Sequence, residues 1–538
     1  MKRFNTLKIM TVFGLAVALF IPSISAWASV AGQKVIRMAL STEPPNLNAM
    51  KATDQQSFFV LGHVMEGLTR YGKNGAVEPG VAERWKTIPN GMVFYLRKNA
   101  KWSDGKTVTA HDFVYGWRTA LLPSTASEYA FILYSIKNAE KVNQGKMGPE
   151  ALGVVAKDDF TLEVTFEKPT PHFLSLSPFA TYYPVREDIV KKFGDKYAAE
   201  AGNLVYNGPF VLTKWIHGAS LKMDKNPTYW NAAKIKIDQI DVPYITADPN
   251  ARFNFFKDKS TDLLETLAKE DLPKAAKEKY KMQSHSDGSL FFMEFNFLPG
   301  KPTRNIHLRK AIQLVFDVNT YVNKVVAIPG TKPGRTLIPT WVRGVKGQFR
   351  KEYPIAPVKV DYAKARAEME IAKKELGGAI PPLVWVTGDS PFSAREAEYF
   401  QTVFREKLGI DLKIDKQIFK QRLEKMGKGE FDIVSAGWGP DYPDAMTFAD
   451  LFTSWNENNR GRYSSPAVDQ AIREAQATAD PKKRMDAMAR AERVVLDELA
   501  ILPTYERVVI WVQNNRIKNV GRNTFGPDPD FTMAEVIK

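Results

Sequence analysis

The chain has 538 residues, of which 44% are apolar, and a formal net charge of +15. This length exceeds that of one ordinary domain, so we expect two or more domains. Cysteine is absent, which excludes disulfide bonds, thiolate metal ligands, a cysteine nucleophile and a lipid-anchored N-terminal cysteine. Basic and acidic residues are interleaved, as in 363–375, so we interpret the charge as a solvated surface and expect no nucleic-acid partner.

The N-terminal segment is typical of a secretory signal peptide. Basic residues in the first eight positions precede a mostly apolar run over 9–21, and Ala26 and Ala28 supply the small residues of a cleavage site. The run is shorter than the roughly 20 apolar residues of a stable transmembrane helix. We therefore expect residues 1–28 to be removed before Ser29, leaving a soluble mature chain.

Short runs rich in β-branched and aromatic residues predict strands in the first half of the chain. These strands are expected over 35–40, 93–96, 161–166 and 211–215. Between the second and third of them, 106–122 is predicted to be helical, and Pro123 ends that helix.

In the second half, strands and helices alternate. Cap residues and apolar periodicity predict helices over 361–377 and 396–408, and others that begin at Phe419, Pro466 and Pro481. Buried strands are predicted over 383–387, 410–414 and 432–436. The resulting β-α-β-α-β order indicates an open α/β sheet.

The last of these strands leads into Gly437-Trp438-Gly439-Pro440-Asp441-Tyr442. Ligands of open α/β sheets bind at the carboxyl ends of the strands. The two glycines would permit unusual backbone angles and the close approach of a ligand. A tight turn with Trp438 packed in the core is equally compatible with this spacing.

Several short blocks of the sequence together carry a resemblance to a known family. They are 82–85 (AERW), 94–98 (FYLRK), 101–106 (KWSDGK), 109–113 (TAHDF), 207–210 (NGPF), 226–231 (NPTYWN), 309–311 (RKA) with Asp317, and 437–442 (GWGPDY). Together they resemble the oligopeptide/dipeptide-binding family of periplasmic solute-binding proteins that serve ABC importers. The resemblance extends over essentially the whole mature chain.

The resemblance implies an α/β fold of the two-lobed periplasmic-binding-protein type, with a double-crossover hinge and an extra domain inserted in the first lobe. The crossovers are expected near 291–294 and 505–508. The expected domains are a discontinuous lobe I over 29–64, 189–291 and 509–538, an inserted domain II over 65–188, and a lobe III over 292–508.

The resemblance also implies how a ligand is held. Asp441 matches a family acid that pairs with the α-ammonium of a bound peptide, because an enclosed positive charge needs an opposed carboxylate. The peptide main chain would add as a strand to the backbone of the site. The other expected contacts are Gly437, Gly439 and Trp438 in lobe III, Asp54 and Gln55 in lobe I, Tyr129 in domain II, and Phe419 and Phe291 in side-chain pockets.

Three positions depart from the family pattern. Ser435 and Met426 stand where close relatives place arginines that face the ligand, and Thr53 replaces a family acid. The sequence therefore supports an anchor for the ligand's ammonium and assigns no cation to its carboxylate.

We expect a periplasmic, monomeric protein that captures short peptides and delivers them to the membrane permease of an ABC importer, without metal or cofactor. Murein peptides, metal chelates or haem are alternative cargoes of the same fold, and a sensor or chaperone role is neither supported nor excluded. A peptide hydrolase is disfavoured, since the six histidines form no HExxH and no G-x-S-x-G is present. Gly105-Lys106-Thr107 lacks the upstream glycine of a P-loop, because Ala100 stands there.

Overall fold

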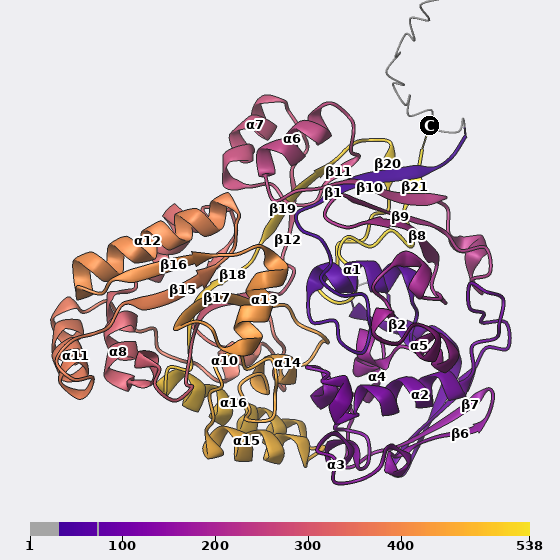
Figure 1. Ribbon diagram of the computed structural model, residues 1–538, viewed down its shortest axis with the longest axis horizontal. Coiled ribbons are helices and arrows are strands. Elements are labelled where there is room, and N and C mark those ends of the chain that lie inside the picture. The colour runs from indigo at the N-terminus through magenta and orange to yellow at the C-terminus, as the bar shows by residue number, and fades with distance from the viewer. Residues whose placement is uncertain (1–31, 73–74, 538) are drawn as a thin grey trace, which may run out of the picture. The chain divides into compact units, whose positions relative to one another are not determined.

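The structure, a computed structural model, describes residues 32–72 and 75–537; the predicted signal peptide lies outside the described residues. Residues 34–538 form one unit, in which three main sheets are covered by helices (Figure 1). In the part of the chain that is described, no helix combines the length and the apolar character needed to cross a bilayer.

The first sheet has seven strands drawn from three distant parts of the chain. Its order is β12 (Gln283–His285), β19 (Val509–Gln513), β11 (Leu263–Leu264), β1 (Val35–Leu40), β10 (Gln239–Ile245), β9 (Ser220–Lys225) and β8 (Phe210–Ile216). Strand β1 is parallel to both of its neighbours, and the remaining pairs are antiparallel. Helix α1 (Gln55–Val64) packs against β8, and α6 (Pro249–Lys257) contacts β11.

The second sheet has six strands and carries the predicted β-α-β-α-β unit. Its order is β14 (Lys332–Pro333), β18 (Ile501–Glu506), β13 (Leu290–Phe295), β17 (Ile433–Trp438), β15 (Leu383–Thr387) and β16 (Leu412–Lys416). Strand β15 is parallel to β16 and β17, as that unit requires, whereas β13 is antiparallel to both of its neighbours. The open α/β sheet is therefore confirmed, with an antiparallel extension.

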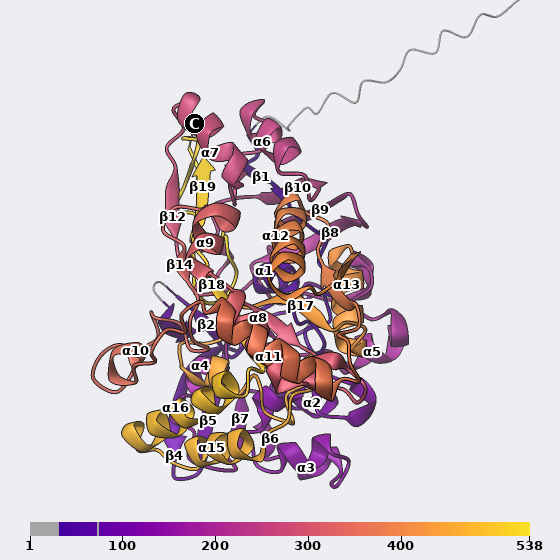
Figure 2. The same ribbon diagram turned by 90° about the vertical axis from the view of Figure 1, so that its left-hand side faces the viewer.

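Helices cover this second sheet. They are α8 (Ile306–Val315), α11 (Tyr362–Glu375), α12 (Pro391–Leu408) and α13 (Phe419–Lys428), and Figure 2 shows the first three toward the viewer. Phe400 of α12 stacks on Trp385 of β15, with 4.9 Å between ring centroids, and both side chains are fully buried. Two further helices, α15 (Pro466–Gln476) and α16 (Pro481–Asp497), pack against each other.

The third sheet is a four-stranded antiparallel one, and two of its strands contain residues of the recognised blocks 82–85 and 94–98. Its order is β4 (Ala82–Ile88), β5 (Gly91–Leu96), β7 (Thr161–Thr165) and β6 (Val154–Asp158). Helix α2 (Ala110–Ala120) contacts β6, and its Phe113 and Trp117 are fully buried. Phe94, Leu96 and Phe113 of the recognised blocks are thus buried in the core of this body. We use lobe I, domain II and lobe III for the bodies built on the seven-, four- and six-stranded sheets.

The chain passes twice between lobe I and lobe III. It leaves β12 at His285 and enters β13 at Leu290, and it leaves β18 at Glu506 and enters β19 at Val509. Phe291 consequently stands inside a strand of lobe III.

The cap signals predicted several helix starts correctly. Asp361 accepts a hydrogen bond from the Lys364 amide at the start of α11, and Asp480 does the same for Lys483 at the start of α16. The prediction for α12 began five residues late. Its cap is Ser390, which accepts from the Ser393 amide, and Pro391 opens its first turn.

Two strand predictions were wrong at their ends. The strand expected over 410–414 begins at Leu412, because Gly409 and Ile410 close α12. Their amides donate to the carbonyls of Arg405 and Phe404, and Gly409 has φ +67°, as in a Schellman ending. The strand expected over 432–436 runs from Ile433 to Trp438.

Candidate functional site

The predicted loop begins two residues later than expected, because Gly437 and Trp438 belong to β17. Gly437 pairs with Phe291 of β13, and a Cβ on Gly437 would lie 2.7 Å from the Phe291 ring. A Cβ on Gly439 would lie 2.8 Å from the Gln55 Nε2 atom, which comes from lobe I. Neither glycine has a positive φ, so close approach rather than an unusual backbone angle requires them.

Asp441 follows β17 and is 5% exposed. The Tyr129 hydroxyl of domain II donates to its Oδ1 over 3.0 Å, although the two residues are 312 positions apart. Its own amide donates to Thr447 Oγ1 over 3.0 Å, and the Tyr71 hydroxyl donates to its main-chain oxygen over 3.1 Å. Among the residues described, Asp441 forms no ion pair with a cationic side chain.

Burial raises the pKa of Asp441 well above its ordinary value, and the nearby carboxylate of Asp450 adds to this rise. The hydrogen bonds from Tyr129 and Thr447 oppose it only in part. A positive group in contact with Asp441 would stabilise the ionised carboxylate and offset the effect of burial.

Most of the predicted site residues line one cavity of about 420 Å³. These are Asp54, Gln55, Tyr129, Phe291, Phe419, Gly437, Trp438 and Gly439. The ninth, Asp441, lines an adjoining cavity of about 40 Å³, and Gln55 lines both. The structure therefore gathers residues of lobe I, domain II and lobe III around one space.

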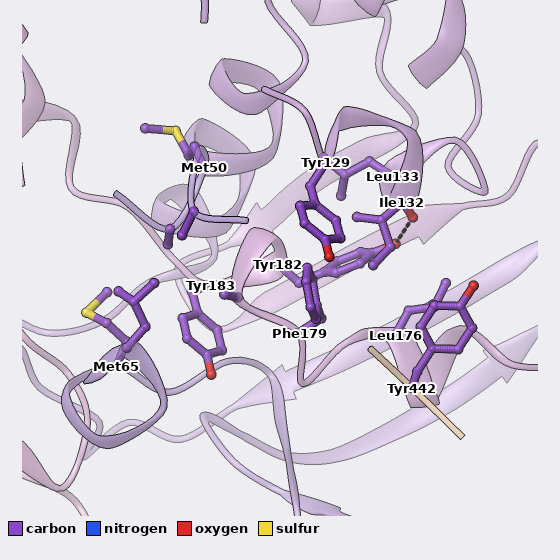
Figure 3. Close-up of a cluster of buried hydrophobic side chains, with 14 of the residues drawn as sticks. Met50, Met65, Tyr129, Ile132, Leu133, Leu176, Phe179, Tyr182, Tyr183 and Tyr442 are labelled. Carbon is purple, nitrogen blue, oxygen red and sulfur yellow. Dashed lines mark hydrogen bonds between the residues drawn. The ribbon is translucent and has the colours of Figure 1, made fainter. Parts of the chain in front are cut away.

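An aromatic stack forms one wall of this space. Tyr129 stacks on Trp438 with 6.0 Å between centroids and lies 4.8 Å from Phe179. Figure 3 shows Tyr129 beside Phe179 in a buried cluster that continues to Tyr182 of domain II. Trp438 is 9% exposed, so it both packs against this core and lines the cavity.

Asp54 has a local structural role. It caps α1 by accepting from the Gln56 and Ser57 amides, and the Ser57 hydroxyl donates to its Oδ2 over 2.6 Å. Burial nevertheless raises its pKa to about 6. Its carboxylate is thus engaged by its own helix, and Gln55 presents the side chain that reaches lobe III.

The cavity wall also contains three arginines that sequence reasoning missed. They are Arg252 on α6, Arg422 on α13 and Arg507 between β18 and β19. Thr53 and Met426 line the same wall, and the main-chain oxygen of Ser435 accepts a hydrogen bond from Arg422 over 3.3 Å. In sequence, each arginine stands outside the recognised blocks, which is why no pattern indicated it.

Direct bonds connect domain II with lobe III beside the cavity. Glu128 forms an ion pair of 2.5 Å with Arg460 and accepts at its main-chain oxygen from Asn458. Glu140 forms a second ion pair, of 3.0 Å, with Arg473. With the Tyr129–Asp441 bond, these contacts join domain II to lobe III.

Two sheets joined by two crossings, with a cavity lined by residues of both lobes, are typical of a two-lobed binding protein. A sequence profile described as "Bacterial extracellular solute-binding proteins, family 5 Middle" matches residues 76–460. The chain belongs to this family, which consists of solute-binding proteins and not of enzymes.

Individual relatives agree with this assignment. The chain is 31% identical to the dipeptide-binding protein DppE of Bacillus subtilis over 93% of its own length and 91% of the relative's. Its structure is similar to the substrate-binding domain of an oligopeptide ABC transporter from Bacillus anthracis, with a TM-score of 0.90, 35% identity and coverage of 94% and 99% of the two chains. It is also similar to Listeria monocytogenes OppA bound to peptide, with a TM-score of 0.87, 33% identity and coverage of 94% and 100%. These similarities confirm the predicted two-lobed α/β fold.

Proposed function

We propose that this protein captures short peptides in the cavity between its lobes and delivers them to the membrane permease of an ABC importer. The observation that carries the proposal is the buried carboxyl of Asp441, which has no cationic partner among the described residues and lines a cavity beside the larger one between the lobes. A peptide supplies such a partner in its α-ammonium. Family membership and the peptide-binding relatives support the same cargo.

In this proposal each predicted residue has a physical role. Asp441 pairs with the ammonium, and Tyr129 positions the Asp441 carboxylate through its hydroxyl. Gly437 and Gly439 leave room for the ligand's main chain beside β17, where it would pair as an added strand. Trp438, Phe291 and Phe419 line the space for side chains together with Asp54 and Gln55 of lobe I.

The domain boundaries and the cellular location are further parts of the proposal. Lobe I would comprise 29–64, 189–289 and 509–538, domain II 65–188, and lobe III 290–508, with hinges in the two crossing segments. The first boundary of lobe III is moved to Leu290 because β13 begins there. We propose that the chain is exported through a signal peptide cleaved before Ser29 and acts in the periplasm as a monomer.

Native mass spectrometry tests the cargo. The purified protein is mixed with a synthetic library of random peptides of two to five residues, and the masses retained on the folded protein are recorded. Peptide masses are expected on the wild type and are expected to be lost on Asp441→Asn. Failure of every peptide to bind, with the protein folded by circular dichroism, would contradict peptide capture.

A further inference from the structure

Two arginines face the ligand cavity from opposite lobes. Arg422 lies in the first turns of α13 in lobe III, and Arg252 lies on α6 in lobe I. Both line the cavity of about 420 Å³, and Arg252 is only 8% exposed. Nothing in the fold of either helix requires a cation at these positions.

Neither guanidinium forms an ion pair with the protein, as far as the described residues extend. Arg422 makes a single hydrogen bond, to the Ser435 carbonyl over 3.3 Å, and its buried Nε has no acceptor. The buried Nε of Arg252 also has no acceptor. Both side chains consequently keep donors that the protein leaves unused.

A third arginine of the cavity wall, Arg507, differs because the protein provides a carboxylate for its guanidinium. Arg507 lines the same cavity, but it forms an ion pair with Asp287 and its Nε donates to that carboxylate over 2.5 Å. Arg395, close by on α12, pairs with Glu270 over 2.7 Å, although its buried Nε also has no acceptor. Arg507 and Arg395 are therefore each paired with a carboxylate of the protein, whereas Arg422 and Arg252 form no ion pair among the described residues.

Acidic groups act on the two arginines only from beyond ion-pair distance. Glu396 and Asp389 attract Arg422, but Glu396 is itself buried and accepts from the Tyr321 hydroxyl over 2.5 Å. Glu265, Asp271 and Asp248 attract Arg252, and Glu265 does so most strongly. Burial lowers the pKa of both arginines, which shows that these acids do not compensate the desolvation of the two cations.

We propose that Arg422 and Arg252 hold a carboxylate of the bound ligand, one from each lobe. The proposal rests on the proposed function and specifies the ligand further, as a zwitterion. Arg422 contacts Ser435, three residues before the end of β17, and Asp441 lies three residues beyond that end. The strand segment from Ser435 to Trp438 alone spans about 10 Å. This is roughly the length of a ligand of three extended residues. A guanidinium and a carboxylate form the paired hydrogen bonds that both arginines lack.

The experiment uses two libraries of random peptides of two to five residues, identical except that one carries free C-terminal acids and the other C-terminal amides. Affinities of retained peptides are measured by native mass spectrometry for the full protein and for Arg422→Gln, Arg252→Gln and Arg422→Lys. Lys428→Gln is the matched control, because it removes a positive charge from the exposed end of the same helix α13. The melting temperature of each ligand-free variant checks folding.

We expect wild type to prefer free acids over amides by roughly 30-fold, the effect of removing one partner of a buried charge pair. Arg422→Gln and Arg252→Gln should weaken this preference, Arg422→Lys should retain part of it, and Lys428→Gln should leave it unchanged. A second outcome also supports the site. If amides that contain Asp or Glu bind as well as acids and lose affinity in Arg422→Gln, the carboxylate held by the arginines comes from a ligand side chain. Equal binding of acids and amides in every variant, without dependence on acidic side chains, overturns the inference and leaves peptide capture intact. Absence of binding to either library overturns the proposed function itself.

Discussion

Replacing Asp441 by Asn should weaken ligand binding strongly while leaving the fold intact. The substitution keeps the shape of the side chain and its acceptor for the Tyr129 hydroxyl, and removes only the negative charge. Because Asp441 is 5% exposed, water screens an ammonium–carboxylate pair there very little. Removing one partner of such a pair costs about 2–5 kcal/mol, which is roughly a 30-fold loss of affinity or more.

Calorimetric titration can isolate this pair. A peptide that binds in the library experiment is prepared with a free and with an N-acetylated amino terminus, and each form is titrated into wild type and Asp441→Asn. Acetylation removes the same interaction from the ligand side. The two losses should therefore be strongly non-additive, since either change alone already breaks the pair.

The ligand-free protein provides the test against a merely structural role. Burial holds the pKa of Asp441 well above its ordinary value, so the ionised carboxylate is destabilising in the closed, empty cavity. Asp441→Asn should leave the melting temperature at pH 7 unchanged or raise it. If the melting temperature falls and the acetylated peptide binds wild type as tightly as the free one, Asp441 supports the turn and does not recognise the ligand's terminus.

Further predictions concern closure, pH and packing. Small-angle scattering should show a smaller radius of gyration when a binding peptide saturates the protein, and identical curves would argue against a hinge. Burial raises the pKa of Asp450 to about 8, with the Asp444 carboxylate adding to the rise, so ionising it costs stability as pH increases from about 4 to 8. Asp450→Asn should therefore raise the melting temperature more at pH 8.5 than at pH 5, and an equal change at both would refute this. Gly437→Ala places a Cβ 2.7 Å from the Phe291 ring and should cost about 1–3 kcal/mol of unfolding free energy in urea melts. Gly439→Ala should cost less, because its closest contact is the flexible end of Gln55 and the next is the Ser289 hydroxyl at 3.3 Å.

Signals confined to a few consecutive residues allowed the helices to be predicted well. A capping side chain bonds to an amide two or three residues away, so Asp361 and Asp480 disclose their helices without knowledge of the fold. The start of β16 was misplaced because Ile410, although β-branched, uses its amide to close α12. β-propensity alone does not reveal where a backbone donor is already engaged.

The end of β17 shows a different limit of prediction from sequence. Glycine is a poor strand former, and the sequence prediction places the Gly437–Trp438 pair in the loop that follows the strand. In the structure both residues pair with β13, a strand from a distant part of the sequence, and the lack of a side chain at Gly437 makes room for Phe291. The pairing depends on tertiary contacts that no local pattern encodes.

The arginines of the cavity could not be predicted for a related reason. Arg422 lies in a helix with several other charged residues, among them Lys420, Glu424 and Lys428, which are exposed, and such a pattern is typical of a solvated surface. Its burial results from the meeting of lobe I and lobe III around the cavity. Asp441, by contrast, was predicted because its place after a lobe III strand and the recognised block agree.

The charges around the cavity give a physical reason for closure to depend on the ligand. In the closed form Asp441 is buried without a cation, and Arg422 and Arg252 face the cavity without a carboxylate, within the described residues. Opening the lobes exposes these groups to water and relieves their desolvation. A ligand that brings an ammonium and a carboxylate compensates both sets of charges only when the lobes are closed, so it shifts the population toward the closed form by its difference in affinity for the two states. A neutral molecule of the same size would fill the space without this difference, so the proposed roles of these residues predict that closure is selective for zwitterions.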